Sequence, residues 1–399
     1  MPTVEEDILH LLSEAAVPGV AIATVRDGRL AQYVCCGARS ARTAEPVDQN
    51  TVFEAASLSK PVFAHAVLQL ADQGRLSLTA PLGDYLPNYI AIDPRAAFVT
   101  ATDVLSHCTG LPNWRSADYP LKTYFERRDR FSYSGEGFLY LQKVVEALTG
   151  EPISTLIERL VLEPLGMTQS SFVWHPRLGQ NRALPHDAFG KPALSYKPGE
   201  ANAAWSLQTT ASNFACFLMA VLNGSRLKTE TARLWLRPHM EVKHHGIQSL
   251  GSRADDVVTG VAWGLGWGLE VDAGTFFHWG DNGPFTAFTI GSVRQRAAVV
   301  IFTNGASGLS IMPDLIAHFT PGDRPSLVWL DYVRHQAPVR RVLRAALVRG
   351  IRKVWSEAES ADLGLPELRW IAQGLSANGR EADSLWIRAK IDERSSAIT

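Results

Sequence analysis

The sequence has 399 residues, of which 46% are hydrophobic and 20% charged, proportions typical of a folded globular protein rather than a disordered or collagen-like chain. Its 39 lysine and arginine residues balance 40 aspartate and glutamate residues, so the net charge of -1 creates no long-range field that would gather nucleic acid or anionic lipid. We therefore expect no nucleic-acid partner. Since no apolar run is long enough to cross a bilayer, we also expect no membrane-spanning segment.

The first residues bear on the cellular location. Glu5, Glu6 and Asp7 stand where a secretory signal would carry positive charge, and no small-residue cleavage site follows an apolar core. We therefore expect a cytoplasmic protein. Four cysteines without C-x-x-C spacing are expected to be buried thiols rather than a disulfide framework or a zinc site: Cys35, Cys36, Cys108 and Cys216.

The N-terminal part of the chain predicts a helix, a hairpin and a second helix. Ile8, Leu11 and Leu12 share one face of a short amphipathic helix. Two β-rich runs then flank the turn residues Asp27-Gly28, which predicts a β-hairpin. From residue 61 to residue 70 the apolar residues again recur at helical spacing.

The middle of the chain, to about residue 240, is predicted to be mostly helical, with Gly/Pro breaks near residues 110, 150, 164 and 192–198. From Val261 the pattern changes to short aromatic and β-branched runs separated by turn residues, which predicts consecutive antiparallel strands. If these strands and the N-terminal hairpin join one sheet, the fold class is α+β.

Beyond Pro321-Gly322 the sequence becomes helical again, with an apolar stripe from Val339 to Val354 opposite a row of basic residues. A second pair of helices is expected around Asn378-Gly379. We predict one domain over residues 1–320, with a helical insertion over about 70–255, and a helical appendage over residues 321–399. The appendage is either a packing element or the contact of a homo-oligomer.

The chemistry begins with Ser57-Leu58-Ser59-Lys60. The sequence contains no G-x-S-x-G, H-E-x-x-H, Walker or G-x-G-x-x-G motif. A serine three residues before a lysine on one helix places the amine beside the hydroxyl, where it can take or steer the serine proton. Ser225 and Lys228 have the same spacing but lie in a polar loop, where no apolar residues would hold the lysine in place. We expect this second match to be incidental.

Two further groups are weaker signals when taken alone. Tyr133 lies in a Gly-rich stretch just before a predicted helix, and His278 ends an apolar strand. Residues of either type in such places are more often packing residues than catalytic ones.

Taken together, these groups resemble the serine β-lactamase and penicillin-binding protein superfamily, and the H-x-G form of the third motif is similar to its class C β-lactamase and family VIII carboxylesterase branch. The segments PGVAIATVRDG, VLSHCTGLP and LVLEPLGMTQSSF extend the resemblance over about residues 15 to 310. The resemblance implies a β-lactamase/transpeptidase-like fold, in which helices flank an antiparallel sheet. The three motifs are Ser57-x-x-Lys60, Tyr133-Ser134-Gly135 and His278-Trp279-Gly280.

Carried over to this chain, the resemblance implies that Ser57 is the acyl-accepting nucleophile, with Lys60 as its hydrogen-bonded partner. Tyr133 would relay the proton as a base, and His278 would complete the polar network around it. The backbone N–H groups of Ser57 and Asp281 would form the oxyanion hole. The substrate would contact Gly135, Trp205, Trp279 and Gly280, with Trp263 and Trp267 as further candidates for aromatic walls.

Two positions depart from the family pattern. Gly135 stands where the family usually has an asparagine whose amide touches the substrate, and His278 stands where class C β-lactamases have a lysine. Both changes weaken the case for recognition of a β-lactam and favour esters or small amides.

We therefore expect a serine hydrolase that forms an acyl-enzyme, acting as a carboxylesterase on small uncharged acyl esters. Amide, peptide or β-lactam hydrolysis and acyl transfer stay open, as does a catalytically silent binding protein. The expected partner is a small ester or amide, and no metal or organic cofactor is implied.

Overall fold

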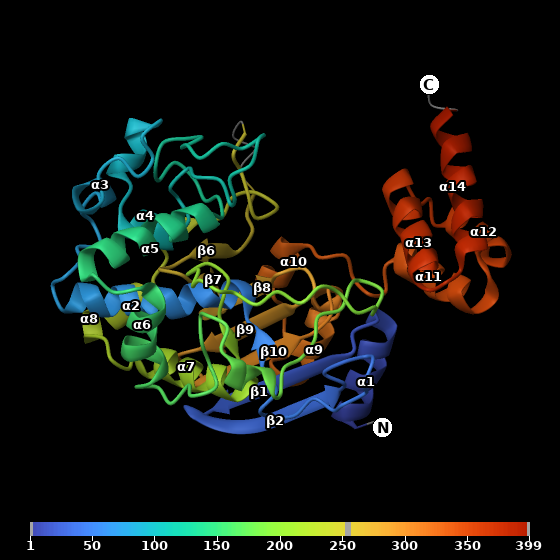
Figure 1. The fold of residues 1–399 in the computed structure, drawn as a ribbon, viewed down its shortest axis with the longest axis horizontal. Coiled ribbons are helices and arrows are strands. Elements are labelled where there is room, and N and C mark those ends of the chain that lie inside the picture. The colour runs from blue at the N-terminus through green and yellow to red at the C-terminus, as the bar shows by residue number, and fades with distance from the viewer. Residues whose placement is uncertain (1–2, 252–256, 397–399) are drawn as a thin grey trace.

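A computed structural model describes residues 3–251 and 257–396 (Figure 1). Within them, eight strands form one antiparallel sheet in the order β2-β1-β10-β9-β8-β7-β6-β5. The strands are β1 Gly19–Arg26, β2 Arg29–Gly37, β5 Met240–Glu241, β6 Val261–Trp263, β7 Gly268–Glu270, β8 Thr275–Asp281, β9 Thr286–Ser292 and β10 Ala297–Thr303.

The N-terminal hairpin and the late strands join through β1 and β10, in which Val20 lies opposite Thr303. The α+β class and the hairpin are thus confirmed. Side chains of β1 alternate between two cores: Ile22 packs with the cluster that contains helix α1 (Val4–Ala15), and Ala23 packs with the cluster that contains α2. Because both faces of the sheet are covered, the central strands are buried almost throughout.

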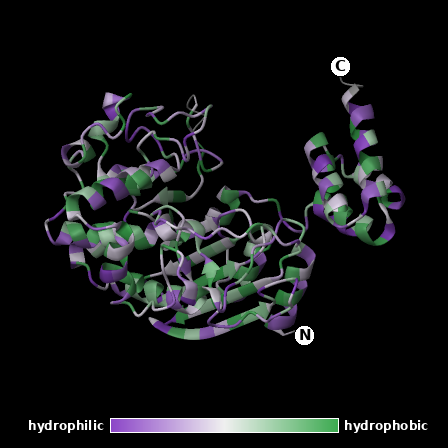
Figure 2. Ribbon diagram, viewed as in Figure 1, coloured by the Kyte–Doolittle hydropathy of each residue, from purple (hydrophilic) through white to green (hydrophobic). Residues whose placement is uncertain are grey.

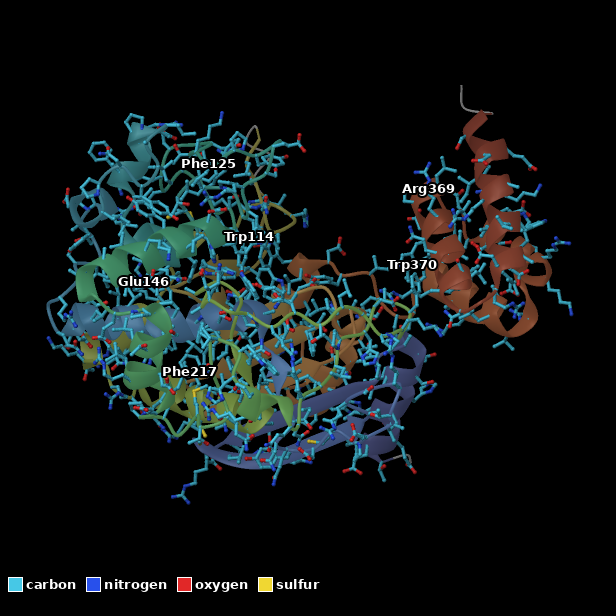
Figure 3. The ribbon with its side chains drawn as sticks, viewed as in Figure 1. Trp114, Phe125, Glu146, Phe217, Arg369 and Trp370 are labelled. Carbon is cyan, nitrogen blue, oxygen red and sulfur yellow. The ribbon has the colours of Figure 1, made fainter. Side chains whose placement is uncertain are left out.

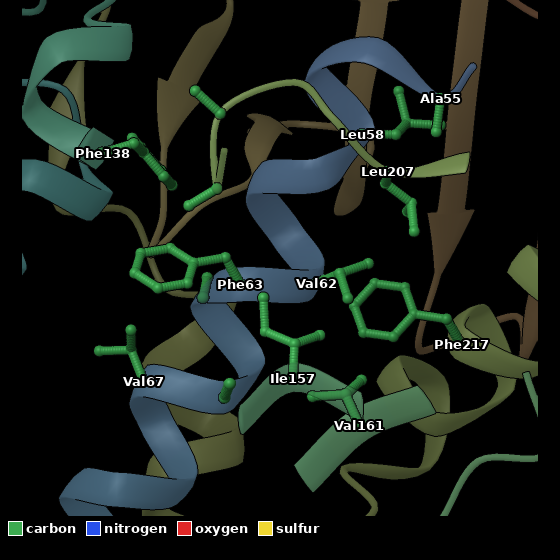
Figure 4. Packing of buried hydrophobic residues seen from close by; sticks show 14 of the residues in the cluster. Ala55, Leu58, Val62, Phe63, Val67, Phe138, Ile157, Val161, Leu207 and Phe217 are labelled. Atoms are coloured by element: carbon green, nitrogen blue, oxygen red, sulfur yellow. The ribbon is translucent and has the colours of Figure 1, made fainter. Parts of the chain in front are cut away.

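Helix α2 (Ser59–Asp72) runs through the larger core. Every residue from Ser59 to Leu70 is buried, so this helix is surrounded on all sides. In Figure 4, Val62 and Phe63 of α2 meet side chains of the neighbouring helices, among them Phe138 and Phe217. A helix held in this way fixes the residues at its first turn.

The middle of the chain is less helical than expected. Its Gly/Pro-rich stretches leave much of residues 106–134 and 163–207 without regular structure. A two-stranded sheet pairs Phe53 with Thr209 across this region. The remaining elements are β3 Phe53–Glu54, β4 Gln208–Thr209, η1 Ala56–Leu58, η2 Pro94–Phe98, η3 Glu158–Leu162, η4 Pro176–Gly179, α3 Leu82–Tyr85, α4 Ala101–Leu105, α5 Gly135–Thr149, α6 Ile153–Ile157, α7 Ala211–Asn223 and α8 Thr229–Trp235.

After β10, the segments η5 (Gly308–Ser310), α9 (Met312–Phe319) and α10 (Pro325–Leu330) pack on the body. Trp329 of α10 is buried in the same core as the sheet, although it lies beyond residue 320, where we placed the end of the first domain.

Four helices then stand to one side of the body (Figure 1). They are α11 Pro338–Arg349, α12 Ile351–Ser360, α13 Leu365–Ala377 and α14 Glu381–Ser396. Polar and apolar residues alternate along them (Figure 2), and their apolar faces form a separate core. The stripe expected from Val339 to Val354 is divided between two helices, because Gly350 adopts a φ of +87° and ends α11.

This four-helix group, α11–α14, touches the body at a few points. The guanidinium of Arg340 donates to the hydroxyl of Ser307 (2.9 Å), and that of Arg344 donates to the backbone carbonyl of Glu14 (3.0 Å). Phe189 packs against Trp370, which faces the body in Figure 3, with ring centroids 5.1 Å apart. Part of the predicted basic row therefore binds the body instead of facing water.

Three properties concern the described part of the chain as a whole. No helix in it is long and apolar enough to cross a membrane. Its four cysteines are free, two of them buried and two half-buried. The same residues contain no group of three or more His, Cys, Asp or Glu side chains arranged to hold a metal ion.

Candidate active site

Ser57 lies in the short turn η1, between strand β3 and helix α2. The residue before it, Ala56, has a left-handed φ of +48°, a conformation that costs a residue with a Cβ about 1–2 kcal/mol. The surrounding core holds this strained turn, which leaves Ser57 partly exposed while its neighbours are buried. The serine hydroxyl is thus presented at a surface on a rigid support.

Lys60 approaches Ser57 from the first turn of α2. Its Nζ lies 3.1 Å from Ser57 Oγ and donates to the carbonyl of Ala204 at 2.9 Å. Its side chain is 1% exposed, and within the described residues it forms no ion pair with a carboxylate. Burial therefore lowers the pKa of Lys60 well below its usual value, which favours a neutral amine.

Tyr133, two residues before α5, is the third side chain beside Ser57 and Lys60. Its ring lies 4.6 Å from Lys60 Nζ, and the residue is 2% exposed. Burial raises the pKa of the Tyr133 phenol above its usual value, with a smaller opposite effect from the Ser57 hydroxyl. Its hydroxyl forms no hydrogen bond with the part of the chain that the structure describes.

His278 lies on β8, behind the cavity wall. Its Nδ1 donates to the carbonyl of Trp279 at 2.7 Å, which leaves Nε2 as the acceptor, buried and without a partner among residues 3–251 and 257–396. Burial lowers the pKa of His278 to about 3. The rings of His278 and Tyr133 are neighbours, 6.2 Å apart, but no hydrogen bond joins them in the described structure.

His107 is a buried neighbour of Tyr133 that the sequence analysis missed. Its ring stacks on that of Tyr133 with centroids 4.2 Å apart, and its Nδ1 accepts the backbone N–H of Ser134 at 3.0 Å. Its φ of +54° is unusual for a histidine. The residue lies in the segment VLSHCTGLP, where no catalytic motif indicates it.

Gly280 allows β8 to lie against η1. A Cβ on Gly280 would lie 2.5 Å from the carbonyl oxygen of Ala55 and 3.1 Å from the Cβ of Ala56, so a glycine is needed there. This close approach brings Asp281, at the end of β8, to the same cavity as Ser57.

A cavity of about 410 Å³ opens at Ser57. Six of the residues that we predicted for the site line it. Trp263 and Trp267 do not: both are fully buried, with their rings next to that of His278. Five other lining residues come from loops that the motifs did not indicate. The lining is Ser57, Lys60, Tyr133, Trp205, Trp279 and Asp281, together with Asn113, Trp114, Ile247, Asn282 and Tyr332.

Gly135 does not line the cavity, because Trp114 lies against it and leaves no room for a side chain. A Cβ at this position would lie 2.6 Å from the indole of Trp114, which lies beside one end of α5 (Figure 3), and 3.0 Å from the carbonyl oxygen of Asn113. The Asn113 side chain instead accepts the Gly135 N–H at 2.9 Å, and Arg115 pairs with the buried Glu136 at 2.7 Å. The Trp114 indole and the Asn113 carbonyl therefore occupy the space that a side chain at position 135 would need.

A buried ion pair supports the rim of the cavity. Glu54 accepts from Arg182 at 2.7 Å and from the Asn282 amide at 3.1 Å. Both charged side chains are almost fully buried. They connect β3, just before the Ser57 turn, to the loop after β8. By contrast, Lys228 of the second S-x-x-K sequence is exposed.

The chain is similar in sequence and in fold to several known proteins. The family model described as Beta-lactamase matches residues 4–317. Esterase EstB of Burkholderia gladioli is 29% identical over 194 residues, which cover 41% of this chain and 49% of EstB, about half its length. Penicillin-binding protein 4 of Amycolatopsis lactamdurans is 26% identical over 341 residues, which cover 76% of this chain and 85% of the relative. The octameric penicillin-binding protein homologue from Pyrococcus abyssi has a similar fold, with a TM-score of 0.67 at 20% identity over 86% of this chain and 80% of that one.

Proposed function

The chain belongs to the beta-lactamase family of serine hydrolases, and on that premise we propose that it is a carboxylesterase that forms an acyl-enzyme on Ser57 and acts on small uncharged esters. One observation carries the proposal: the Ser57 hydroxyl lies 3.1 Å from a buried amine of lowered pKa, at the wall of a cavity large enough for a small substrate.

In the proposed acylation step, the neutral amine of Lys60 accepts the Ser57 proton as the oxygen attacks the ester carbonyl. The carbonyl of Ala204 accepts a hydrogen bond from this amine. That bond orients the amine, so that the nitrogen lone pair of Lys60 is directed at the Ser57 hydroxyl. The N–H groups of Ser57 and Asp281 donate to the developing oxyanion. Acylation thus starts from two uncharged groups.

We assign Tyr133 the donation of a proton to the departing alkoxide rather than the initial base role that the resemblance implied. Its raised pKa keeps the phenol protonated, whereas the lowered pKa of Lys60 suits the base. The tyrosinate would regain its proton from the lysine ammonium. Water then hydrolyses the acyl-enzyme with the same groups in reverse roles.

The lining of the cavity favours an uncharged substrate. Trp114, Trp205, Trp279 and Ile247 provide apolar walls, and the lining residues that the structure describes include no arginine and no lysine other than Lys60, whose lowered pKa favours the neutral amine. With a pKa of about 3, His278 is neutral near pH 7 and offers no charge to a β-lactam carboxylate. The similarity of the chain to EstB, which is named as an esterase, also supports an ester substrate.

Amide hydrolysis is the second candidate. It is favoured by the Asn113 carboxamide, which lines the cavity. The oxygen of this group accepts the N–H of Gly135, and its N–H₂ makes no hydrogen bond to the described residues. This donor could hold the amide of a substrate in place of the missing motif asparagine. A competing amine or alcohol in the assay distinguishes hydrolysis from acyl transfer.

A homo-oligomer is also part of the proposal. The octameric state named for the Pyrococcus abyssi protein supports it, and the four-helix group α11–α14 is the surface that we propose for the contact. Light scattering of the full chain and of a chain ending at residue 336 would test this assignment.

The decisive experiment is intact-mass analysis after exposure to p-nitrophenyl esters, small amides and penicillins. We expect a stoichiometric acyl adduct from the esters, located on Ser57 by peptide mapping. Ser57→Ala should lose the adduct and turnover, whereas the matched control Ser225→Ala should keep both. An unmodified wild-type protein with every compound would favour the silent binding protein instead, and faster turnover of a penicillin would overturn the ester preference.

A further inference from the structure

Among the described residues that line the cavity, Tyr332 is the one outside residues 4–317, which the family model matches. It belongs to the connection between α10 and α11. We propose that Tyr332 is a positioning residue for the oxyanion hole: its hydroxyl holds the Asp281 carboxylate away from the place where the negative charge of the substrate develops. This inference rests on the proposed acyl-enzyme function.

Asp281 creates a problem that Tyr332 can solve. The proposed oxyanion hole uses the backbone N–H of Asp281, yet the same residue carries a carboxylate, and a negative charge that turned toward the oxyanion would oppose its formation. Both carboxylate oxygens are bound elsewhere. Oδ1 accepts the N–H of Gly283 at 2.8 Å, and Oδ2 accepts the hydroxyl of Tyr332 at 3.1 Å. No cation pairs with this carboxylate in the described residues, so these two donors fix its direction.

The chain around Tyr332 is itself held in place. Before it, Trp329 is buried, donates through its indole N–H to the carbonyl of His244 at 3.1 Å, and lies 5.7 Å from the ring of Trp279. Asp331 then turns the chain with a left-handed φ of +49°. After it, Arg334 pairs with Asp314 at 2.7 Å. The tyrosine is therefore fixed on both sides at the cavity wall.

The hydroxyl of Tyr332 is protonated near neutral pH and can act as the donor in this hydrogen bond. Burial, together with the adjacent Asp281 charge, raises the pKa of this phenol above its usual value. The Tyr332 ring also lines the cavity, so its removal would enlarge the substrate site. Loss of the hydroxyl and loss of the ring should thus affect different kinetic constants.

The test compares Tyr332→Phe and Tyr332→Ala in pre-steady-state acylation by a p-nitrophenyl ester. For Tyr332→Phe we expect the acylation rate to fall about tenfold with KM nearly unchanged, the effect of one hydrogen bond to a charged group. Tyr332→Ala should also raise KM. The matched control Tyr124→Phe, which removes a 3.1 Å hydrogen bond to the carbonyl of Pro120 outside the cavity, should leave both constants unchanged.

A double-mutant cycle separates positioning from general damage. In an Asp281→Asn background there is no charge to hold, so adding Tyr332→Phe should lower the acylation rate less than threefold. An equal loss in both backgrounds, or a Tyr332→Phe enzyme that acylates at the wild-type rate, overturns the inference alone. A wild-type protein that forms no adduct on Ser57 overturns the proposed function, and the inference with it.

Discussion

Replacement of Gly135 by alanine would test how the second motif of this chain is built. The new Cβ would lie 2.6 and 2.7 Å from two carbons of the Trp114 indole. Carbon atoms in contact prefer about 3.5–4.0 Å, so the indole would have to withdraw by about 1 Å. Overpacking of this kind costs about 1–3 kcal/mol. Because Trp114 is 42% exposed and can move toward water, we expect the low end, a loss of about 1 kcal/mol.

The assay is a double-mutant cycle by urea unfolding. With Trp114→Ala in place, the indole no longer opposes the new methyl group and only the Asn113 carbonyl oxygen, 3.0 Å away, still does, so Gly135→Ala should cost clearly less than in the wild-type background. The coupling energy should be about 1 kcal/mol. Displacement of the indole from the cavity should also raise KM for esters with apolar acyl groups. If Gly135→Ala cost the same in both backgrounds, the steric explanation for the glycine would be wrong.

Three further predictions follow from the buried charges. The pKa of Lys60 is lower in the folded than in the unfolded protein, so between these two pKa values the unfolded state binds more protons. In that window, which ends at the unfolded value of about pH 10.4, the unfolding free energy should rise with pH by up to about 1.4 kcal/mol per unit. Lys60→Met should remove this slope in urea titrations. The rate kcat/KM should fall as the pH drops through the pKa of Lys60, and His278→Gln should not shift this limb of the pH–rate profile, because His278 titrates near 3. Arg182→Met leaves Glu54 buried without its cation and should cost about 3–5 kcal/mol. The matched control is Arg159→Met, which breaks a surface pair and should cost less than about 1 kcal/mol in the same unfolding assay.

The parts of the fold that were predictable depend on local patterns. The turn Asp27-Gly28 lies between two alternating runs, and the aromatic, β-branched segments after Val261 are separated by turn residues, so both regions could be identified as strands. The Ser57 and Lys60 pair was predictable for the same reason, since a spacing of three residues brings two side chains together in any continuous helical turn, and here the turn η1 leads directly into α2.

The other site residues depend on contacts between distant segments. Asn113 and Trp114 matter because their loop lies against the first turn of α5, and Tyr332 matters because α10 returns the chain to the cavity. The residue pattern within either segment does not indicate that the segment will contact the cavity. For the same reason the sequence did not show that Trp263 and Trp267 belong to the core. Their apolar surroundings predict burial, but they do not tell whether the side chains face the cavity or the interior.

Because β1 pairs with β10, the sheet can be completed only after the chain has been synthesised to residue 303. While the ribosome is still adding the middle of the chain, the N-terminal hairpin has been synthesised but the strand that covers one side of it has not. An uncovered strand edge can pair with another nascent chain. Closing a loop between such distant partners is also slow, because contacts of high sequence separation form late. The yield of native protein in a cell should therefore depend on how fast translation reaches residue 303, and on chaperones that cover β1 until then.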